Sequence, residues 1–250
     1  MDLQLEGKRA IVTGGSRGIG KAIARALTAE GVDVVIAARD AERLKAAADE
    51  LAGASGRQVV PVVADTSDDE AVRALVATTL DRLGGVDILV NNAATPGSVA
   101  PPGPLSSLRD EDVLADLQVK VLGYLRTARA VAPHLVDQGW GRIINISGLA
   151  ARTAGRIAGS IRNVSVAALT KNLADELGPH GVNVTVVHPG ITRTERTDRH
   201  LPDRPFNSIG RVVEADEVAA VVTFLASPVS VAINGDAIAA GGGTPGPIFY

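Results

Sequence analysis

The sequence predicts a single α/β domain in which helices cover both faces of a parallel sheet. Short apolar runs alternate with longer amphipathic ones along the whole chain. The short runs are apolar throughout, as strands covered on both faces are. The 250 residues suit one large domain, and no linker rich in proline, glycine or serine divides them. We therefore treat residues 1–250 as one domain.

Seven apolar runs are the expected strands, at residues 9–14, 33–38, 59–64, 87–92, 142–147, 182–188 and 236–240. The runs between them carry apolar residues at three-to-four spacing, which is typical of helices, and several open on Asp or Ser. These expected helices are residues 18–30, 40–52, 67–83, 109–138, 156–178 and 214–226. The segment 95–108, rich in proline and glycine, follows a strand and is expected to be a loop beside the functional site.

Composition excludes several classes of function. The net charge is −3 and both signs are interspersed, so we expect a small-molecule partner rather than nucleic acid or an anionic membrane. The chain has no cysteine, which excludes thiol chemistry and fits a cytoplasmic location. Its four histidines lack metal-ligand spacing, so no metal site is expected. No signal sequence or membrane-length apolar run is visible.

The first expected strand runs into a glycine-rich turn, TGGSRGIG at residues 13–20, and a helix follows at once. Gly14, Gly18 and Gly20 allow a tight turn, a close backbone approach to a pyrophosphate and close helix packing. The positive end of the helix then points at the phosphates. Such a triplet also occurs in purely structural turns. The strand before it and the helix after it favour a dinucleotide site.

The second strand ends on an arginine, Arg39, where a protein of this architecture that prefers NAD would carry an acidic residue. Arginine there favours the 2′-phosphate of NADP(H), and Arg17 in the glycine turn could bind the same phosphate. The neighbouring Asp40 is explained as the cap of the next helix. Either arginine alone would more often be a surface residue, whereas the pair favours NADP(H) over NAD.

Several further motifs occur in order along the chain: Asp65 after the third strand, NNAA at 91–94, GRIINIS at 141–147, LTKNLADEL at 169–177, HPGITRT at 188–194 and AGGG near the end. With TGGSRGIG they make the chain resemble the short-chain dehydrogenase/reductase superfamily over residues 7–243, most of all its ketoacyl reductases and hydroxysteroid dehydrogenases. The resemblance implies a single Rossmann-type doubly wound domain with a seven-stranded parallel sheet. It also implies a nicotinamide cofactor and a homo-oligomer, either a tetramer or a dimer.

The resemblance also implies roles for matching residues. Asp65 would accept a hydrogen bond from the adenine amino group, and Asn91 and Ala93 would flank the adenosine ribose. Pro189, Gly190 and Thr194 would lie along the nicotinamide and its phosphate. Alternatively, Asp65 caps the helix that follows it, and Pro189–Gly190 simply ends a strand. The complete expected cofactor-binding set is Gly14, Ser16, Arg17, Gly18, Ile19, Gly20, Arg39, Asp65, Thr66, Asn91, Ala93, Pro189, Gly190 and Thr194.

The catalytic positions depart from the family pattern. Family members carry a proton-donating tyrosine, a lysine four residues later on the same helix face, a serine after the fifth strand and an asparagine on the fourth helix. Here the tyrosine, lysine, serine and asparagine positions are Gly159, Asn163, Gly148 and Lys120, respectively. The interval from Gly148 to Gly159 is about two residues shorter than usual. No tyrosine lies between Tyr124 and Tyr250 to compensate for a shift in register.

Two of these departures look reciprocal. A lysine has replaced the asparagine on one helix, and an asparagine has replaced the lysine on the other. We hypothesise that the Lys120 ammonium lies in the pocket in place of the lost lysine; the alternative is that Lys120 points to solvent. The other candidate replacement donors are Ser147, Ser160, His188 and Arg156. Of these only Ser147 is retained, with Lys120, as a candidate catalytic residue.

Three functions remain open on the sequence. The first is an NADP(H)-dependent oxidoreductase that acts on a carbonyl or alcohol through a non-standard proton donor. The second is a catalytically silent NADP(H)-binding protein, a sensor or a partner subunit in a mixed oligomer. The third is a lyase or isomerase that uses the nucleotide as a scaffold. The substrate pocket is expected to form from residues 95–108 and 191–210, and its shape does not follow from the sequence.

Overall fold

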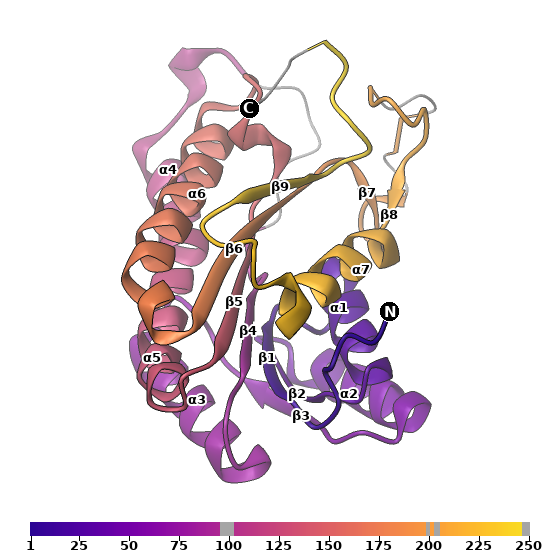
Figure 1. Cartoon of the computed structure of the whole chain (residues 1–250). Helices are drawn as coiled ribbons and strands as arrows, with labels where there is room; N and C mark the ends of the chain where they lie inside the picture. The colour runs from indigo at the N-terminus through magenta and orange to yellow at the C-terminus, as the bar shows by residue number, and fades with distance from the viewer. Residues whose placement is uncertain (96–102, 199–200, 203–205, 247–250) are drawn as a thin grey trace.

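A computed structural model describes residues 1–95, 103–198, 201–202 and 206–246 (Figure 1). Parts of the two segments expected to form the substrate pocket, residues 96–102, 199–200 and 203–205, lie outside the described residues. None of the helices in the described ranges is long and apolar enough to cross a membrane.

Seven parallel strands form one sheet in the order β3-β2-β1-β4-β5-β6-β9, which confirms the predicted fold class. Each strand lies within one residue of its predicted bounds. The strands are β1 Arg9–Thr13, β2 Asp33–Ala38, β3 Val59–Val63, β4 Ile88–Asn91, β5 Gly141–Ile146, β6 Val182–Pro189 and β9 Ala237–Ala240. A separate pair of two-residue strands, β7 Thr192–Arg193 and β8 Val213–Glu214, was not predicted.

Helices cover both faces of the sheet (Figure 1). One face carries α1 Gly18–Ala29, α2 Ala41–Ser55 and α7 Ala215–Ala226, which pack on a large apolar cluster built around β1 and β2. The other face carries α3 Asp69–Leu83, α4 Asp110–Asp116, α5 Leu122–Asp137 and α6 Ile157–Leu177, and a second cluster lies beneath them. Short 3₁₀ turns at Leu105–Ser107, Leu149–Ala151, Gly178–His180 and Pro228–Ser230 complete the connections.

Helix caps explain where several of these helices begin. The Asp40 side chain accepts a hydrogen bond from the Arg43 amide, which confirms the cap predicted for α2. Helix α3 is capped by Asp68, which accepts from the Glu70 amide. Asp65 is therefore not the cap of that helix, and its Oδ1 instead accepts from the Ser67 amide at 2.9 Å.

The expected helix 109–138 contains a π-helical turn. Leu117–Val121 form this turn between α4 and α5, and it includes Lys120. A π turn closes hydrogen bonds over one residue more than an α turn and occurs frequently at functional sites. The sequence pattern does not predict it, because apolar residues at three-to-four spacing indicate the α-helical period throughout.

Strand β1 lies between β2 and β4, and the sheet grows outward from it in both directions. The connections on either side of this point run to opposite faces, which leaves a crevice beyond the carboxyl ends of the two central strands. The glycine-rich turn follows β1 directly and therefore lies at this crevice.

Candidate active site

A cavity of about 980 Å³ lies along the carboxyl ends of the strands. The cavity extends from the glycine-rich turn to α6. We call the part beside the glycine-rich turn its nucleotide end and the part beside α6 its catalytic end. Twelve of the fourteen residues expected to bind the cofactor line it, together with Lys120 and Ser147. The twelve are Gly14, Ser16, Arg17, Gly18, Ile19, Arg39, Asp65, Thr66, Ala93, Pro189, Gly190 and Thr194. Gly20 and Asn91 are not among the lining residues.

The glycine-rich turn is held in place by close backbone packing. Gly14 adopts φ +67°, in the left-handed region that favours glycine. A Cβ on Gly20 would overlap the carbonyl oxygen of Gly14, so Gly20 serves the packing of α1 rather than the cavity wall. The Asn92 side chain donates to the backbone oxygens of Thr13 and Gly14 at 3.1 and 3.2 Å. Asn92 was missed by the sequence analysis, although it stands in the NNAA motif.

The start of α1 is open to an anion. Its N-cap residue, Arg17, makes no side-chain cap among the described residues, so no N-cap side chain occupies the first amides of the helix. The Gly18 amide donates to Oε2 of Glu195 at 3.0 Å. A carboxylate thus stands where the helix end favours negative charge, which is the position that a cofactor phosphate would take.

The predicted adenosine side of the cavity contains an arginine and a carboxylate. Arg39 Nη1 lies 3.7 Å from Asp65 Oδ2, and both side chains are exposed. Burial opposes ionisation of Asp65, but hydrogen bonds from Ser67 and the nearby charge of Arg39 hold its pKa below the usual value. Arg43 lines the same end and was not predicted. Two guanidinium groups are therefore exposed at the place where a 2′-phosphate is expected.

Asn91 lies in the core rather than at the cavity. Its side chain donates to Asn145 Oδ1 at 3.0 Å and accepts from Thr127 Oγ1 at 2.6 Å, and all of these atoms are buried. These bonds join β4, β5 and α5 behind the site. Asn91 is thus placed to support the cavity wall.

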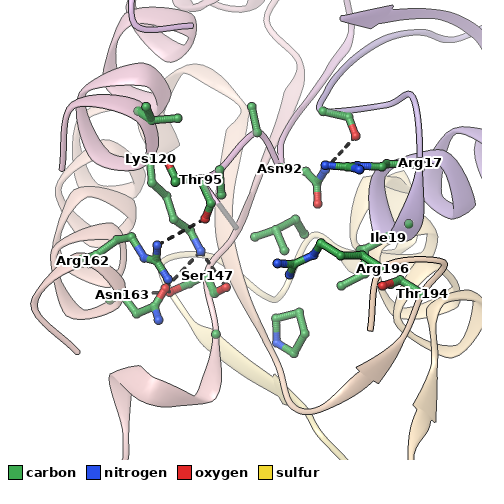
Figure 2. A pocket seen from close by; sticks show the side chains of 18 of the residues that line it. Arg17, Ile19, Asn92, Thr95, Lys120, Ser147, Arg162, Asn163, Thr194 and Arg196 are labelled. Atoms are coloured by element: carbon green, nitrogen blue, oxygen red, sulfur yellow. Dashed lines mark hydrogen bonds between the residues drawn. The ribbon is translucent and has the colours of Figure 1, made fainter. Parts of the chain in front are cut away.

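Lys120 enters the catalytic end of the cavity and does not point to solvent. Its side chain leaves the π turn, only 5 % of the residue is exposed, and it lines the cavity. Nζ donates to the Ser147 backbone oxygen at 2.8 Å and to Asn163 Oδ1 at 3.0 Å. Ser147 Oγ lies 3.0 Å from the Asn163 backbone oxygen. Figure 2 shows these three side chains converging from three different elements.

The environment of Lys120 favours the neutral amine. Burial, followed by the positive charge of Arg162, lowers its pKa from 10.5 to about 7, while Asp116 acts in the opposite direction. A lysine with a pKa near 7 is present in both protonation states at neutral pH. It can therefore donate or accept a proton without a large energetic cost.

The two glycines at the serine and tyrosine positions differ in the space around them. Among the described residues, a Cβ on Gly159 would meet Arg156 Cβ alone, at 3.6 Å, which is an ordinary contact. A Cβ on Gly148 would lie 3.3 Å from Asn163 Nδ2, which is a tight contact. The space available at Gly159 is therefore greater than that at Gly148.

The other candidate proton donors lie outside the set of described residues that line the cavity. His188 is buried, and burial lowers its pKa to about 4. Ser160 donates to the Thr153 backbone oxygen, and Arg156 stands at the N-cap position of α6 without a side-chain cap among the described residues. The Tyr124 hydroxyl donates to the Ile146 backbone oxygen, and burial raises its pKa. Only Ser147 and Lys120 of the candidates border the space where a substrate would lie.

Two arginines in the cavity lining were also missed by the sequence analysis. Arg162 and Arg196 both line the cavity (Figure 2). Arg162 adjoins Asn163 and Arg196 lies two residues after Thr194, so these positions were the available signal. The sequence pattern did not indicate the direction of either side chain.

Comparison with known proteins identifies the family. Residues 8–205 match the family described as short chain dehydrogenase. The short-chain reductase protein NovJ of Streptomyces niveus is 35 % identical over 249 residues, covering 94 % of this chain and 93 % of its own length. The (2S)-[(R)-hydroxy(phenyl)methyl]succinyl-CoA dehydrogenase subunit BbsD of Thauera aromatica is 33 % identical over 246 residues, with coverage of 96 % and 97 %.

A solved structure shows the same fold. The crystal structure of a short chain dehydrogenase from Burkholderia cenocepacia in complex with NADP superposes with a TM-score of 0.86 at 39 % identity, covering 96 % of this chain and 98 % of that one. These relatives are named as reductases and dehydrogenases, and the agreement spans both the sequence and the fold. The chain belongs to the short chain dehydrogenase family.

Proposed function

We propose that this protein is an NADP(H)-dependent oxidoreductase acting on a carbonyl or alcohol, in which Lys120 replaces the tyrosine as proton donor. The observation that carries the proposal is the position of Lys120 Nζ, buried at the catalytic end and held by Ser147 and Asn163. A lysine on the π turn and an asparagine on α6 thus meet in one cluster. This arrangement supports the exchange of roles between the two helices.

The nucleotide end supports NADP(H) as the cofactor. The open amides of α1 and the Glu195 carboxylate beside Gly18 indicate an anion site that suits the pyrophosphate. Arg17 and Arg39 would bind the 2′-phosphate. The related Burkholderia protein was solved in complex with NADP. When bound, the nicotinamide supplies or removes a hydride at the substrate carbon.

Lys120 would supply the proton that balances this transfer. In the reducing direction the carbonyl oxygen gains the Nζ proton as the carbon gains a hydride, and the product is an alcohol. The neutral amine left behind regains a proton from water. In the oxidising direction the neutral amine takes the proton from the alcohol. A pKa of about 7 suits both directions, because a proton donor works best when its pKa lies near the operating pH.

Two measurements on the same protein test this function. NADPH binding is titrated by fluorescence, and NADPH oxidation is then followed against a panel of aldehydes and ketones. We expect binding in the wild type and in Lys120→Met, with turnover in the wild type only. The loss is expected to be about 10²- to 10⁴-fold, as for removal of a general acid.

The matched control is Lys45→Met, because Lys45 is exposed on α2 and pairs with Asp49 outside the cavity. It should leave both binding and turnover unchanged. Equal turnover in Lys120→Met and the wild type would exclude Lys120 as the donor. Absence of NADPH binding in the wild type would exclude the cofactor assignment itself.

A second candidate function, that of a partner subunit without its own activity, is favoured by an exposed apolar surface. Leu114, Leu122, Ile161 and Val164 are exposed on α4, α5 and α6, and an apolar groove runs along the π turn between Leu114 and Leu122. The relative BbsD is named as a subunit of a dehydrogenase. Such a surface suits burial against a second chain, either a further copy or a related protein.

The oligomeric state and the turnover of the isolated protein distinguish the two candidates. Sedimentation of the wild type and of a Leu114→Glu/Val164→Glu variant tests whether this surface is an interface. A homo-oligomer that turns over substrate alone supports the first function. A protein that binds NADPH, remains inactive alone and gains activity only with a related chain supports the second.

A further inference from the structure

The catalytic end of the cavity carries a second buried cation besides Lys120. Arg162 stands on α6 next to Asn163 and lines the cavity, and its side chain is only 12 % exposed. Its charge is felt at Lys120, where it lowers the pKa of the amine. Two positive groups therefore face the space that a substrate would occupy (Figure 2).

The hydrogen-bonding capacity of Arg162 is incompletely used. Nη1 lies 3.0 Å from Asp116 Oδ1 and 3.5 Å from the Thr95 backbone oxygen. Nε is buried and has no partner among the described residues. A guanidinium offers five N–H donors in a planar fork, and leaving a buried donor unpaired costs about 1–3 kcal/mol. Because Arg162 lines the cavity, a ligand there is able to supply acceptors to a guanidinium that the described residues leave partly unpaired.

The local charges favour an anionic ligand. Arg162 and Asp116 cancel, and Lys120 adds a positive charge in its protonated state. Of the two remaining charged neighbours in this part of the cavity lining, Glu195 is bonded to the Gly18 amide at the nucleotide end, and Arg196 adds a further positive group. A carboxylate matches both this balance and the planar fork of arginine, which binds carboxylates through paired hydrogen bonds.

We propose that Arg162 binds a carboxylate group of the substrate, so that the substrates are oxo acids and the corresponding hydroxy acids. This inference rests on the proposed function. The substrate carboxylate would bind to the guanidinium of Arg162 while the substrate carbonyl oxygen faces Lys120 Nζ. One residue thus fixes which end of the substrate meets the proton donor.

Equilibrium binding tests the site without requiring turnover. Malonate and neutral malonamide are titrated calorimetrically into the protein. The protein is first saturated with NADP⁺, so that the arginines of the nucleotide end are occupied and do not bind malonate. We expect malonate to bind at least about 10-fold more tightly, because hydrogen bonds to a charged group contribute about 1.5–3 kcal/mol. The double variant Arg162→Gln/Asp116→Asn should remove this preference without leaving Asp116 unpaired.

Kinetics give a second readout on the same variants. The ratio of kcat/KM for acetoacetate to that for methyl acetoacetate should exceed about 10 in the wild type and fall to about 1 in the double variant. Arg162→Lys should keep part of the preference. Arg129→Gln is the control, because Arg129 is exposed and pairs with Asp69 outside the cavity; it should change neither readout.

The outcomes of these experiments distinguish a failure of this inference from a failure of the proposed function. Malonate binding that survives in the double variant, or that is lost only in Arg39→Gln, overturns the inference. Turnover of carbonyl compounds with no preference for carboxylates also overturns it and leaves the proposed function intact. Malonate binding that depends on Arg162 in a protein without turnover overturns the proposed function and the assignment of oxo acids as substrates, and leaves Arg162 as a carboxylate-binding residue.

Discussion

The two ends of the cavity are built in different ways. At the nucleotide end the geometry comes from the backbone: a glycine turn, the open amides of α1 and the Asn92 bonds that hold the turn to β4. At the catalytic end it comes from side chains on separate elements, in which Lys120 meets Ser147 and Asn163. Backbone features tolerate few substitutions, whereas a side-chain cluster can be rearranged while the fold is kept. The departures from the family pattern that the sequence analysis predicts all fall at the second end.

The largest expected effect comes from restoring the family's residues at the catalytic end. The variant Lys120→Asn/Gly148→Ser/Gly159→Tyr/Asn163→Lys should raise carbonyl reduction about 10²- to 10⁴-fold, the usual contribution of a general acid. Gly159 offers space for the tyrosine, and the tight neighbour of Gly148 is itself replaced. The measurement is NADPH oxidation against the same carbonyl panel.

The matched control for this variant keeps Gly159 and changes the other three positions. It should stay at or below the wild-type rate, because it lacks both Lys120 and the tyrosine. A wild type that already equals the full variant would show that the lysine cluster is as effective a donor as the tyrosine. The two ends of the cavity would then differ in how they are built but the catalytic end would have lost no activity through its substitutions.

The next largest effect tests the rigidity of the nucleotide end. Gly20→Ala places a methyl group against the Gly14 carbonyl oxygen, and such overpacking costs about 1–3 kcal/mol. We expect both a lower denaturation midpoint and weaker NADPH binding. Gly53→Ala is the control, because a Cβ there meets no described atom within 4 Å; in the interior of α2 it should stabilise the protein by about 0.5–1 kcal/mol. Unchanged NADPH binding in Gly20→Ala would show that the turn is more adaptable than its packing indicates.

A smaller effect is expected from the side chains at the nucleotide end. Arg39→Gln should weaken NADPH binding about 10- to 100-fold and leave NADH binding nearly unchanged, since a hydrogen bond to a charged group contributes about 1.5–3 kcal/mol. Fluorescence titration with both nucleotides measures the ratio. Arg109→Gln, which breaks an exposed pair with Asp112, is the control. A parallel loss for NADPH and NADH would show that Arg39 does not recognise the 2′-phosphate.

The last effect concerns stability and pH. The pKa of Lys120 is about 7 in the folded chain, whereas the ordinary lysine value, which applies to the unfolded chain, is 10.5. Between these two values the unfolded chain holds a proton that the folded chain lacks, so the stability contributed by this group rises with pH across that window, by at most about 1.4 kcal/mol per pH unit. The free energy of unfolding of wild type minus that of Lys120→Met should increase from pH 7 to pH 10 in urea titrations. A difference that is constant with pH would contradict the lowered pKa.

The sequence predicted those features that depend on local pattern. The strands follow from continuous apolar runs, the cap at Asp40 from an acceptor before a helix, and the glycine turn from its position between β1 and α1. Side-chain direction was harder to predict. Asn91 and Asn92 are adjacent, yet one points into the core and the other ties the glycine turn. The packing of α5 and β5 around Asn91 determines which of the two side chains points into the core.

The catalytic end shows the same limit more clearly. The exchange between Lys120 and Asn163 was hypothesised from two substitutions, and the structure places the two side chains in contact. Their catalytic role remains a prediction. Arg162 was not singled out, because a charged residue on a helix next to a motif position has no distinguishing pattern. The burial of Arg162, and the lack of a partner for its Nε among the described residues, arise from tertiary packing.

Because Lys120 lies in the π turn at Leu117–Val121, its position depends on the number of residues in this part of the helix as well as on their chemistry. Each residue of an α-helix rotates the chain by about 100°, and a π turn absorbs one additional residue within a turn. The faces of α4 and α5 are therefore out of phase with each other. Deleting a single residue between 117 and 119 would let the helix return to an uninterrupted period and would rotate its first half relative to its second. The active site is thus encoded partly in the number of residues that separate Asp116 from Leu122.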